Sequence, residues 1–225
     1  NEVKALQPTA EGYLYCMDHM LAGSEDSRFE GHNLIFQDEI FNNAINRMKR
    51  MYNSAISENA EYSYRDETHL FNEGKLAIYI NGVWGAPMIS KQIDAKYALL
   101  PTDGGESMSC ISSGLGYVLG NSGNEEKEKA AVKFLKYMLS KKVQTKILEK
   151  TEQIPANPDI SLESYKESKS RLYQAATLVL ETDEKIEVPN NIWSAEQKDY
   201  FIKTIFDVLT GTLSIQEFEE GLENK

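Results

Sequence analysis

The segment at residues 71–84 constrains the fold of this chain more than any other. It reads Phe-Asn-Glu-Gly-Lys-Leu-Ala-Ile-Tyr-Ile-Asn-Gly-Val-Trp. A turn marked by Gly74 precedes a short run of strand-forming residues, and a second turn at Asn81 and Gly82 leads to Trp84. In an open α/β sheet, residues at the carboxyl end of a strand face the ligand crevice. The segment therefore predicts an α/β fold that offers the Trp84 indole to a ligand.

The Trp84 indole has two interpretations at this position. An indole can stack on the apolar C–H face of a sugar, whose hydroxyls then bond to Asn, Asp or Glu side chains. The same ring can instead fill the hydrophobic core or its rim. The sequence leaves both open, and Trp84 is our first ligand-binding candidate, with Asn81 and Gly82 beside it.

Apolar residues recur at helical spacing through most of the chain. The stretch from Asp38 to Tyr52 shows this best, because Ile40, Phe41 and Ile45 fall on one stripe of the predicted helix. We expect helices at about 10–22, 38–52, 65–71, 125–139, 141–150, 161–181, 195–210 and 214–223, and strands at about 76–81, 96–100 and 111–119.

The last of these helices carries its own start signal. Ser214 and Glu217 have the Ser-x-x-Glu spacing of a capping box, in which each side chain binds the backbone N–H of the other residue. Helices and strands are mixed along the chain, and helices predominate. The pattern therefore predicts a helix-rich α/β fold.

The composition excludes several classes of function. A formal net charge of -11 argues against binding to nucleic acid, whose phosphates need basic patches. The three histidines show no metal-binding spacing, and Cys16 and Cys110 have neither CxxC spacing nor the density of a disulfide scaffold. No apolar run approaches the roughly 18 residues needed to cross a bilayer. We expect no cofactor, no metal site and no nucleic-acid partner.

Motifs of known enzyme classes are absent from the sequence. It contains no GxSxG elbow, no Walker A loop and no GxGxxG. Carboxylates are abundant, and a glycosidase needs only a suitably spaced pair of them, although nothing in the sequence singles out such a pair. A fragment of a carbohydrate-active hydrolase therefore stays open beside a binding protein. So does an interaction module that has no ligand of its own.

Four blocks occur in the order and at the spacing of a known family. The first is 71–84, and the second is Tyr-Ala-Leu-Leu-Pro-Thr-Asp-Gly-Gly at 97–105. The third is Ile-Ser-Ser-Gly-Leu-Gly-Tyr-Val-Leu at 111–119, and the fourth runs from Ala130 through two predicted helices to the Pro-Ala-Asn loop at 155–157. Together they resemble family 1 extracellular solute-binding proteins, the sugar-capturing subunits of ABC importers. The resemblance extends from about Glu11 to about Leu222.

The resemblance implies a fold and a division of the chain. Members of this family have two α/β lobes around a ligand cleft, and their chain crosses between the lobes more than once. It implies that residues 5–106 and 161–225 form the second, C-terminal lobe of a periplasmic-binding-protein-like fold. Residues 107–160 would be a crossover segment that belongs to the first lobe. The opening strands of that lobe have no counterpart here, so we expect the chain to be a fragment.

The resemblance also implies where a ligand binds. Glu11 and Tyr13 fall in the region of the cleft acids and aromatics, and surface or core positions are the alternative for both. Ser112, Ser113 and Gly114 match a small-residue stretch at the cleft wall, for which close strand packing is the alternative. Trp193 is a candidate for a second stacking aromatic, although it stands earlier in the chain than its maltose-binding counterpart. The candidate residues are thus Trp84, Asn81, Gly82, Glu11, Tyr13, Ser112, Ser113, Gly114 and Trp193.

As a function, the resemblance implies non-catalytic binding of a solute, most simply a carbohydrate, in the cleft between two lobes. The partners would be that sugar and the membrane permease of an ABC importer. The protein would lie outside the cytoplasm or in the periplasm, tethered by a lipoprotein anchor that this chain does not contain. We also expect that residues 107–160 either pack back on the second lobe or pair copies of the fragment, because that segment has an apolar face and lacks its first-lobe partners.

Overall fold

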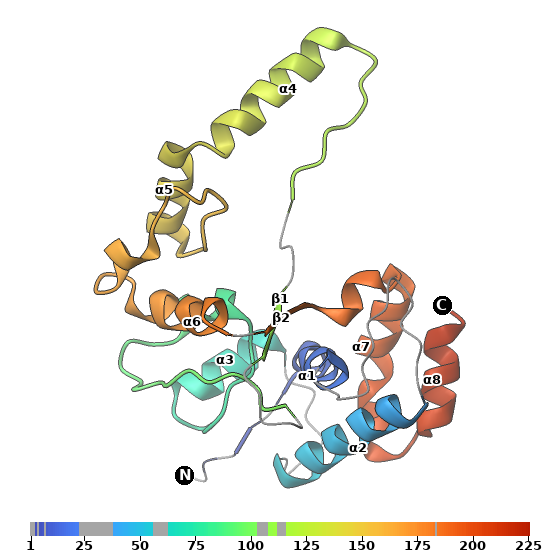
Figure 1. Cartoon of the computed structure of the whole chain (residues 1–225). Helices are drawn as coiled ribbons and strands as arrows, with labels where there is room; N and C mark the ends of the chain where they lie inside the picture. Colours follow the sequence, from blue (N-terminus) through green and yellow to red (C-terminus); the bar gives the residue numbers. More distant parts are fainter. Residues whose placement is uncertain are drawn as a thin grey trace. The chain divides into compact units, whose positions relative to one another are not determined.

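The computed structural model describes residues 3, 5–6, 8–22, 38–55, 63–102, 108–111, 116–182 and 184–225. Its contacts divide the chain into two compact units (Figure 1). Unit 1 comprises Asn1–Asn81, Met88–Ser112 and Thr182–Lys225, and unit 2 comprises Gly82–Pro87 and Ser113–Glu181. The elements in chain order are α1 (Ala10–Ala22), α2 (Asp38–Ala55), α3 (Tyr64–Asn72), the 3₁₀ turn η1 (Val83–Met88), β1 (Met108–Ile111), α4 (Glu125–Met138), α5 (Lys141–Thr151), η2 (Leu162–Tyr165), α6 (Ser170–Leu180), β2 (Glu184–Glu187), η3 (Pro189–Ile192), α7 (Ala195–Thr210) and α8 (Ile215–Glu223).

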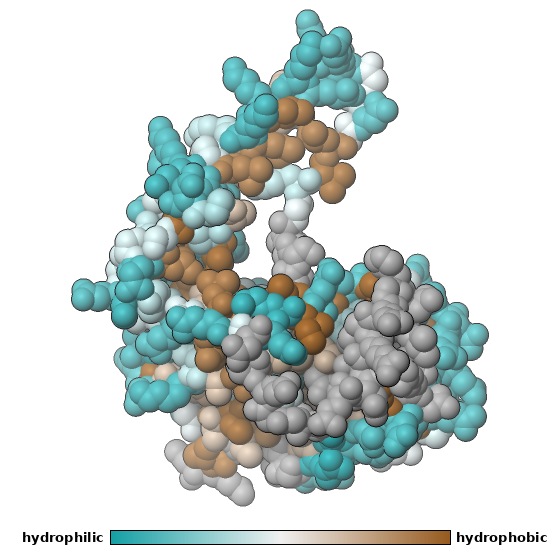
Figure 2. Space-filling model, viewed as in Figure 1, coloured by the Kyte–Doolittle hydropathy of each residue, from teal (hydrophilic) through white to brown (hydrophobic). Residues whose placement is uncertain are grey.

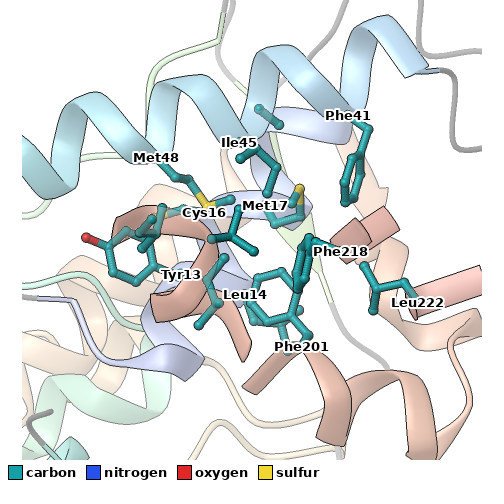
Figure 3. Packing of buried hydrophobic residues seen from close by; sticks show 14 of the residues in the cluster. Tyr13, Leu14, Cys16, Met17, Phe41, Ile45, Met48, Phe201, Phe218 and Leu222 are labelled. Carbon is teal, nitrogen blue, oxygen red and sulfur yellow. The ribbon is translucent and has the colours of Figure 1, made fainter. Parts of the chain in front are cut away.

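The core of unit 1 is built by four helices. Helix α1 packs against α2 and α7, and α7 also packs against α2 and α8. Phe41, Phe201 and Phe218 are completely buried where these helices meet, and Tyr13 and Met17 of α1 reach the same cluster (Figure 3). The apolar stripe that the sequence predicted for α2 therefore faces this core, because its other face carries polar residues that stay in water.

A two-stranded parallel ladder lies beside α1 in unit 1. Met108 to Ile111 of β1 pair with Glu184 to Glu187 of β2, residue by residue. The hydroxyls of Ser109 and Thr182 bond to each other at 2.8 Å. Within the described ranges this is the only ladder of two strands.

Unit 2 contains α4, α5, η2 and α6, and it leaves an apolar face uncovered. No residue of α4 is buried, and Phe134 and Tyr137 are each 56% exposed. Figure 2 shows hydrophobic residues gathered along the part of the chain that Figure 1 labels α4. An amphipathic helix normally buries such a stripe.

The helix predictions are confirmed, with one break. Helices α1 to α8 match the expected ranges, except that the range 161–181 contains η2 and α6 separated by turns. The capping box of α8 is also confirmed. The Ser214 hydroxyl accepts from the Glu217 N–H at 3.2 Å, and the Glu217 carboxylate accepts from the Ser214 N–H at 2.9 Å.

The strand predictions at 76–81 and 96–100 are wrong. Apart from an isolated bridge at Leu76, neither range belongs to a ladder. Ile78 donates its N–H to the carbonyl of Ala5 at 2.8 Å, so this backbone is held by a single strand-like contact. Of the third range, only Ile111 lies in a strand among the residues that are described. A ladder needs a hydrogen-bonded partner, and no partner strand lies beside these residues in the described part of unit 1.

Candidate functional site

Trp84 lies on the 3₁₀ turn η1, and its indole is half exposed at 50%. The turn is closed by the Gly85 N–H, which donates to the carbonyl of Gly82 at 2.9 Å. The indole folds back over Gly82, since a Cβ atom built there would lie 2.2 Å from two ring carbons of Trp84. Gly82 is not in the left-handed region. The glycine is therefore needed for space, because any side chain would push the indole away.

Asn81 ends unit 1 immediately before this turn, and its side chain is bound to α3. Its amide nitrogen donates to the Tyr64 hydroxyl at 2.8 Å and also to the Tyr79 hydroxyl. The Tyr79 hydroxyl lies 2.9 Å from the Thr68 hydroxyl, which donates to the Tyr64 carbonyl at 2.8 Å. Burial raises the pKa of Tyr79, so it stays a neutral hydrogen-bonding phenol.

A second side chain of α3 binds the chain on the far side of the turn. The Asn72 amide nitrogen donates to the Met88 carbonyl at 2.9 Å, and its oxygen accepts from the Ser90 N–H at 2.7 Å. The Tyr64 hydroxyl donates to the Met88 sulfur at 3.2 Å. The sequence analysis missed Asn72 and Tyr64 as contributors to the site. The only signal was that Asn72 lies within the segment 71–84 and Tyr64 a few residues before it.

Glu11 is exposed on the first turn of α1. The turn is held by Thr9, whose hydroxyl accepts from the Gly12 N–H at 3.1 Å. Burial raises the pKa of the neighbouring Tyr15, and the charge of Glu11 and the hydroxyl of Tyr64 raise it further. Glu11, Tyr15 and Tyr64 are therefore close together in unit 1. The structure brings Glu11 near the same tyrosine that holds Asn81.

Glu67 is a buried carboxyl under this cluster that the sequence analysis did not identify. It is 2% exposed on α3. Burial raises its pKa to about 8, the negative charge of Glu11 adds to the rise, and a hydrogen bond from the Thr9 N–H opposes it. Glutamate on a short polar helix is normally exposed, so the sequence held no signal for this burial.

Tyr13 and Trp193 lie in the hydrophobic core. Tyr13 is 0% exposed, its ring meets Phe206 edge to face at 5.9 Å, and its hydroxyl points away from the cluster in Figure 3. Trp193 is 6% exposed and packs against Phe201 with ring centroids 5.8 Å apart. The structure therefore favours the packing alternative for both residues. Ser112, Ser113 and Gly114 lie outside the described residues.

Trp193 is buried because the turn before it is fixed on α1. The Asp18 carboxylate accepts from the Asn190 N–H at 2.8 Å and from the Asn190 side-chain amide. Burial raises the pKa of Asp18 to about 6, and the two bonds from Asn190 oppose the rise. Asp18 thus has a structural role, and it is not part of the cluster around Asn81.

The described residues hold no group of three or more His, Cys, Asp and Glu placed to bind a metal ion. None of the helices in the described ranges is long and apolar enough to cross a membrane. Unit 2 offers the exposed indole of Trp84, and unit 1 offers the exposed carboxylate of Glu11 and a set of tyrosine hydroxyls. Such groups suit recognition of a neutral polar ligand with an apolar face.

The comparisons with known proteins agree on a binding protein. Residues 10–176 match the family described as bacterial extracellular solute-binding protein. A search of curated proteins found no match. A solved solute-binding protein of Streptococcus pneumoniae, in complex with the blood group A-trisaccharide, superposes with a TM-score of 0.81 at 23% sequence identity.

That superposition covers 99% of this chain and 58% of the streptococcal chain. It shows that the chain has the fold of part of a solute-binding protein, as the sequence predicted. The family is one of binding proteins and not of enzymes. Since its match extends over most of the sequence, the chain belongs to the bacterial extracellular solute-binding proteins.

Proposed function

We propose that the chain is the second-lobe part of an extracellular receptor that binds a carbohydrate for an ABC importer. The observation that carries the proposal is the half-exposed indole of Trp84, folded back over Gly82. An exposed indole on a built turn gives a flat apolar surface for a sugar ring. The receptor performs no chemistry on the sugar.

The ligand residues that we propose are Trp84 and Gly82 in unit 2 and, considered separately, Asn81 and Glu11 in unit 1. The carboxylate of Glu11 is exposed and can accept from sugar hydroxyls. Ser112, Ser113 and Gly114 stay proposed residues of the cleft wall. We propose that Tyr13 and Trp193 only pack the core and do not contact the sugar, since their rings are buried. The carbohydrate bound by the streptococcal protein supports a sugar as the ligand class.

We further propose that a first lobe completes this protein. Residues 5–106 and 161–225 would then form the second lobe, and residues 107–160 would belong to the first. The exposed apolar stripe of α4 supports this, because strands of a first lobe would cover it. Closure of the lobes over the sugar would present the receptor to the permease, with a lipoprotein anchor holding it at the membrane.

In the chain alone, we expect the same stripe to pair two copies. Sedimentation velocity should then show reversible association that weakens when Phe134 of α4 is replaced by serine, because the exposed ring supplies apolar contact area. Serine at the exposed polar position Lys127 is the matched control on the same helix. A monomer at all concentrations would contradict pairing through residues 107–160.

Replacing Trp84 by alanine should weaken sugar binding by the two-lobe protein by about 1–3 kcal/mol, because the stacking area is lost. The measurement is titration calorimetry with a panel of oligosaccharides that includes the blood group A-trisaccharide. The chain alone should bind the same sugar weakly or not at all, because half of the cleft wall is absent.

The chain offers a matched control for this experiment. It contains two tryptophans, and Trp193 is buried in the core. Phenylalanine at position 193 should therefore leave the affinity nearly unchanged, and the fluorescence of the remaining Trp84 should respond to the sugar. An unchanged affinity in Trp84→Ala would remove Trp84 from the site. If the two-lobe protein binds none of the oligosaccharides in the panel, the carbohydrate proposal is overturned.

A further inference from the structure

We propose that Glu67 is a positioning residue, which fixes the first turn of α1 through Thr9 and thereby fixes the position of Glu11. The inference rests on the proposed function, because Glu11 is one of the ligand residues proposed in unit 1. Glu67 lies on α3 and Thr9 directly precedes α1, and both belong to unit 1. The buried bond between these two residues carries the inference.

Thr9 holds the first turn of α1 with both its side chain and its backbone. Its hydroxyl accepts from the Gly12 N–H at 3.1 Å, and its carbonyl accepts from the Tyr13 N–H at 2.9 Å. Glu11 lies in the chain between Thr9 and these two donors. The placement of Thr9 therefore decides where the backbone of Glu11 lies, because a capping residue sets the start of its helix.

The chain before α1 packs directly on the same turn. A Cβ atom built at Gly12 would lie 3.1 Å from the Cβ atom of Pro8, which is closer than an ordinary contact. Gly12 is therefore needed for this close approach. Since Pro8 and Gly12 lie against each other, a displacement of Thr9 would move the whole first turn with it.

Glu67 supplies the acceptor that holds Thr9. It accepts a hydrogen bond from the Thr9 N–H, a backbone group that lies before the helix and has no acceptor within it. Glu67 is 2% exposed and Thr9 is 1% exposed, so water does not replace this bond easily. A buried N–H that loses its acceptor costs free energy, and loss of the bond should therefore displace Thr9.

Glu67 acts as a neutral carboxylic acid at pH 7. Burial raises its pKa to about 8, and the negative charge of Glu11 adds to the rise. A neutral acid accepts through its carbonyl oxygen, as the amide of glutamine does. Glutamine at position 67 therefore keeps the bond to Thr9. Methionine has a similar length, but it offers only a weakly accepting sulfur.

A ligand residue that is fixed before binding raises affinity, because its freedom is lost during folding and not during binding. Loss of the bond between Glu67 and Thr9 should therefore weaken sugar binding, although Glu67 is buried and does not contact the sugar. It should also loosen the first turn of α1 before any ligand is added. These two effects can be measured separately.

The first measurement is amide hydrogen exchange of Gly12 and Tyr13, followed by NMR in the ligand-free chain at pH 7. Both amides should exchange about fivefold faster in Glu67→Met, and Glu67→Gln should restore the exchange of the unmodified chain. The amide of Ile205 in α7 is the internal reference, because a change in global stability would speed all three amides. Arg65→Met, at an exposed position of α3, is the matched control and should change none of them.

The second measurement is calorimetric titration of the two-lobe protein with the oligosaccharide panel. Glu67→Met should weaken sugar binding about fivefold, and Glu67→Gln should restore it. If Glu67→Met loosens the turn but no sugar binds, the positioning of the turn stands and the proposed function fails. Equal exchange in Glu67→Met and Glu67→Gln would overturn the inference. It is also overturned if Glu11→Gln weakens sugar binding and Glu67→Met leaves it unchanged.

Discussion

Replacing Phe218 by alanine is expected to lower the free energy of unfolding of unit 1 by about 3–5 kcal/mol. Phe218 is completely buried on α8. Its ring stacks on Phe41 and Tyr200 at centroid distances of 6.0 Å and 5.8 Å, and it meets Phe201 at 5.6 Å. Removing it leaves a cavity where α2, α7 and α8 meet, and it also removes three aromatic pairs.

The measurement is urea unfolding followed by Trp193 fluorescence in a Trp84→Phe background. Trp193 packs against Phe201, so its emission reports the core of unit 1. With a urea dependence of about 2 kcal/mol per molar, the midpoint should fall by roughly 1.5–2.5 M. Phe134→Ala on α4 is the matched control, because its ring is 56% exposed in unit 2.

We expect that control to change the stability of unit 1 by less than about 0.5 kcal/mol when it is measured in dilute protein. Equal losses in the two variants would contradict the central role given to Phe218. Such a result would mean that the four helices of unit 1 do not form one cooperative core.

The helices could be predicted from the sequence because their signals are local. The stripe formed by Ile40, Phe41 and Ile45 needs only its own spacing to indicate a buried face. Ser214 and Glu217 satisfy each other within one turn, so their capping box can be read without knowledge of the remaining chain. The family match supports the same fold over residues 10–176.

The strands could not be predicted in the same way, because a strand depends on a partner. Residues 76–81 alternate suitably, yet they form only isolated contacts with other backbone. Glu184 to Glu187 form β2 although three of these four residues are charged. Their pairing with Met108 to Ile111 is a long-range contact that composition does not encode.

The sequence alone could not separate the exposed candidate residues from the buried ones. Trp84 and Glu11 are exposed, as a ligand residue requires. Tyr13 and Trp193 are large aromatics whose burial only the packed helices reveal. The role of Asn72 depends on Met88 and Ser90, which follow it by 16 and 18 residues. No local pattern links those positions.

Unit 1 is expected to lose stability as the pH rises from 7 to 8, and Glu67 is the cause. In the unfolded chain its carboxyl loses the proton near the ordinary pKa of 4.5, whereas burial holds the folded pKa at about 8. Between these values the folded state binds the extra proton, so the stabilisation is complete below pH 4.5 and is lost as the pH rises through 8. The loss between pH 7 and pH 8 should be about 1 kcal/mol.

Between pH 7 and pH 8, the effect of Glu67 on stability can be separated from the effects of other buried groups of unit 1. Asp18 has a folded pKa of about 6 and is already ionised there. His19 is neutral there in both states, because burial lowers its pKa below the ordinary 6.5. Glu67→Gln keeps the shape of the side chain and an oxygen that can accept from the Thr9 N–H, but it cannot ionise.

Urea unfolding is measured at pH 7.0, 7.5 and 8.0. The free energy of unfolding should fall with pH in the unmodified chain and stay constant in Glu67→Gln. At pH 8, Glu67→Gln should therefore be the more stable of the two. Asp66→Asn is the matched control, because Asp66 is the exposed neighbour that caps α3 through Ser63. That variant keeps an oxygen that can accept from the Ser63 N–H, so it should lose less than about 1 kcal/mol of stability, and it should keep the dependence on pH. If the free energy of unfolding still falls with pH in Glu67→Gln, the bound proton belongs to another group. Glu67 would then be ionised in the folded chain.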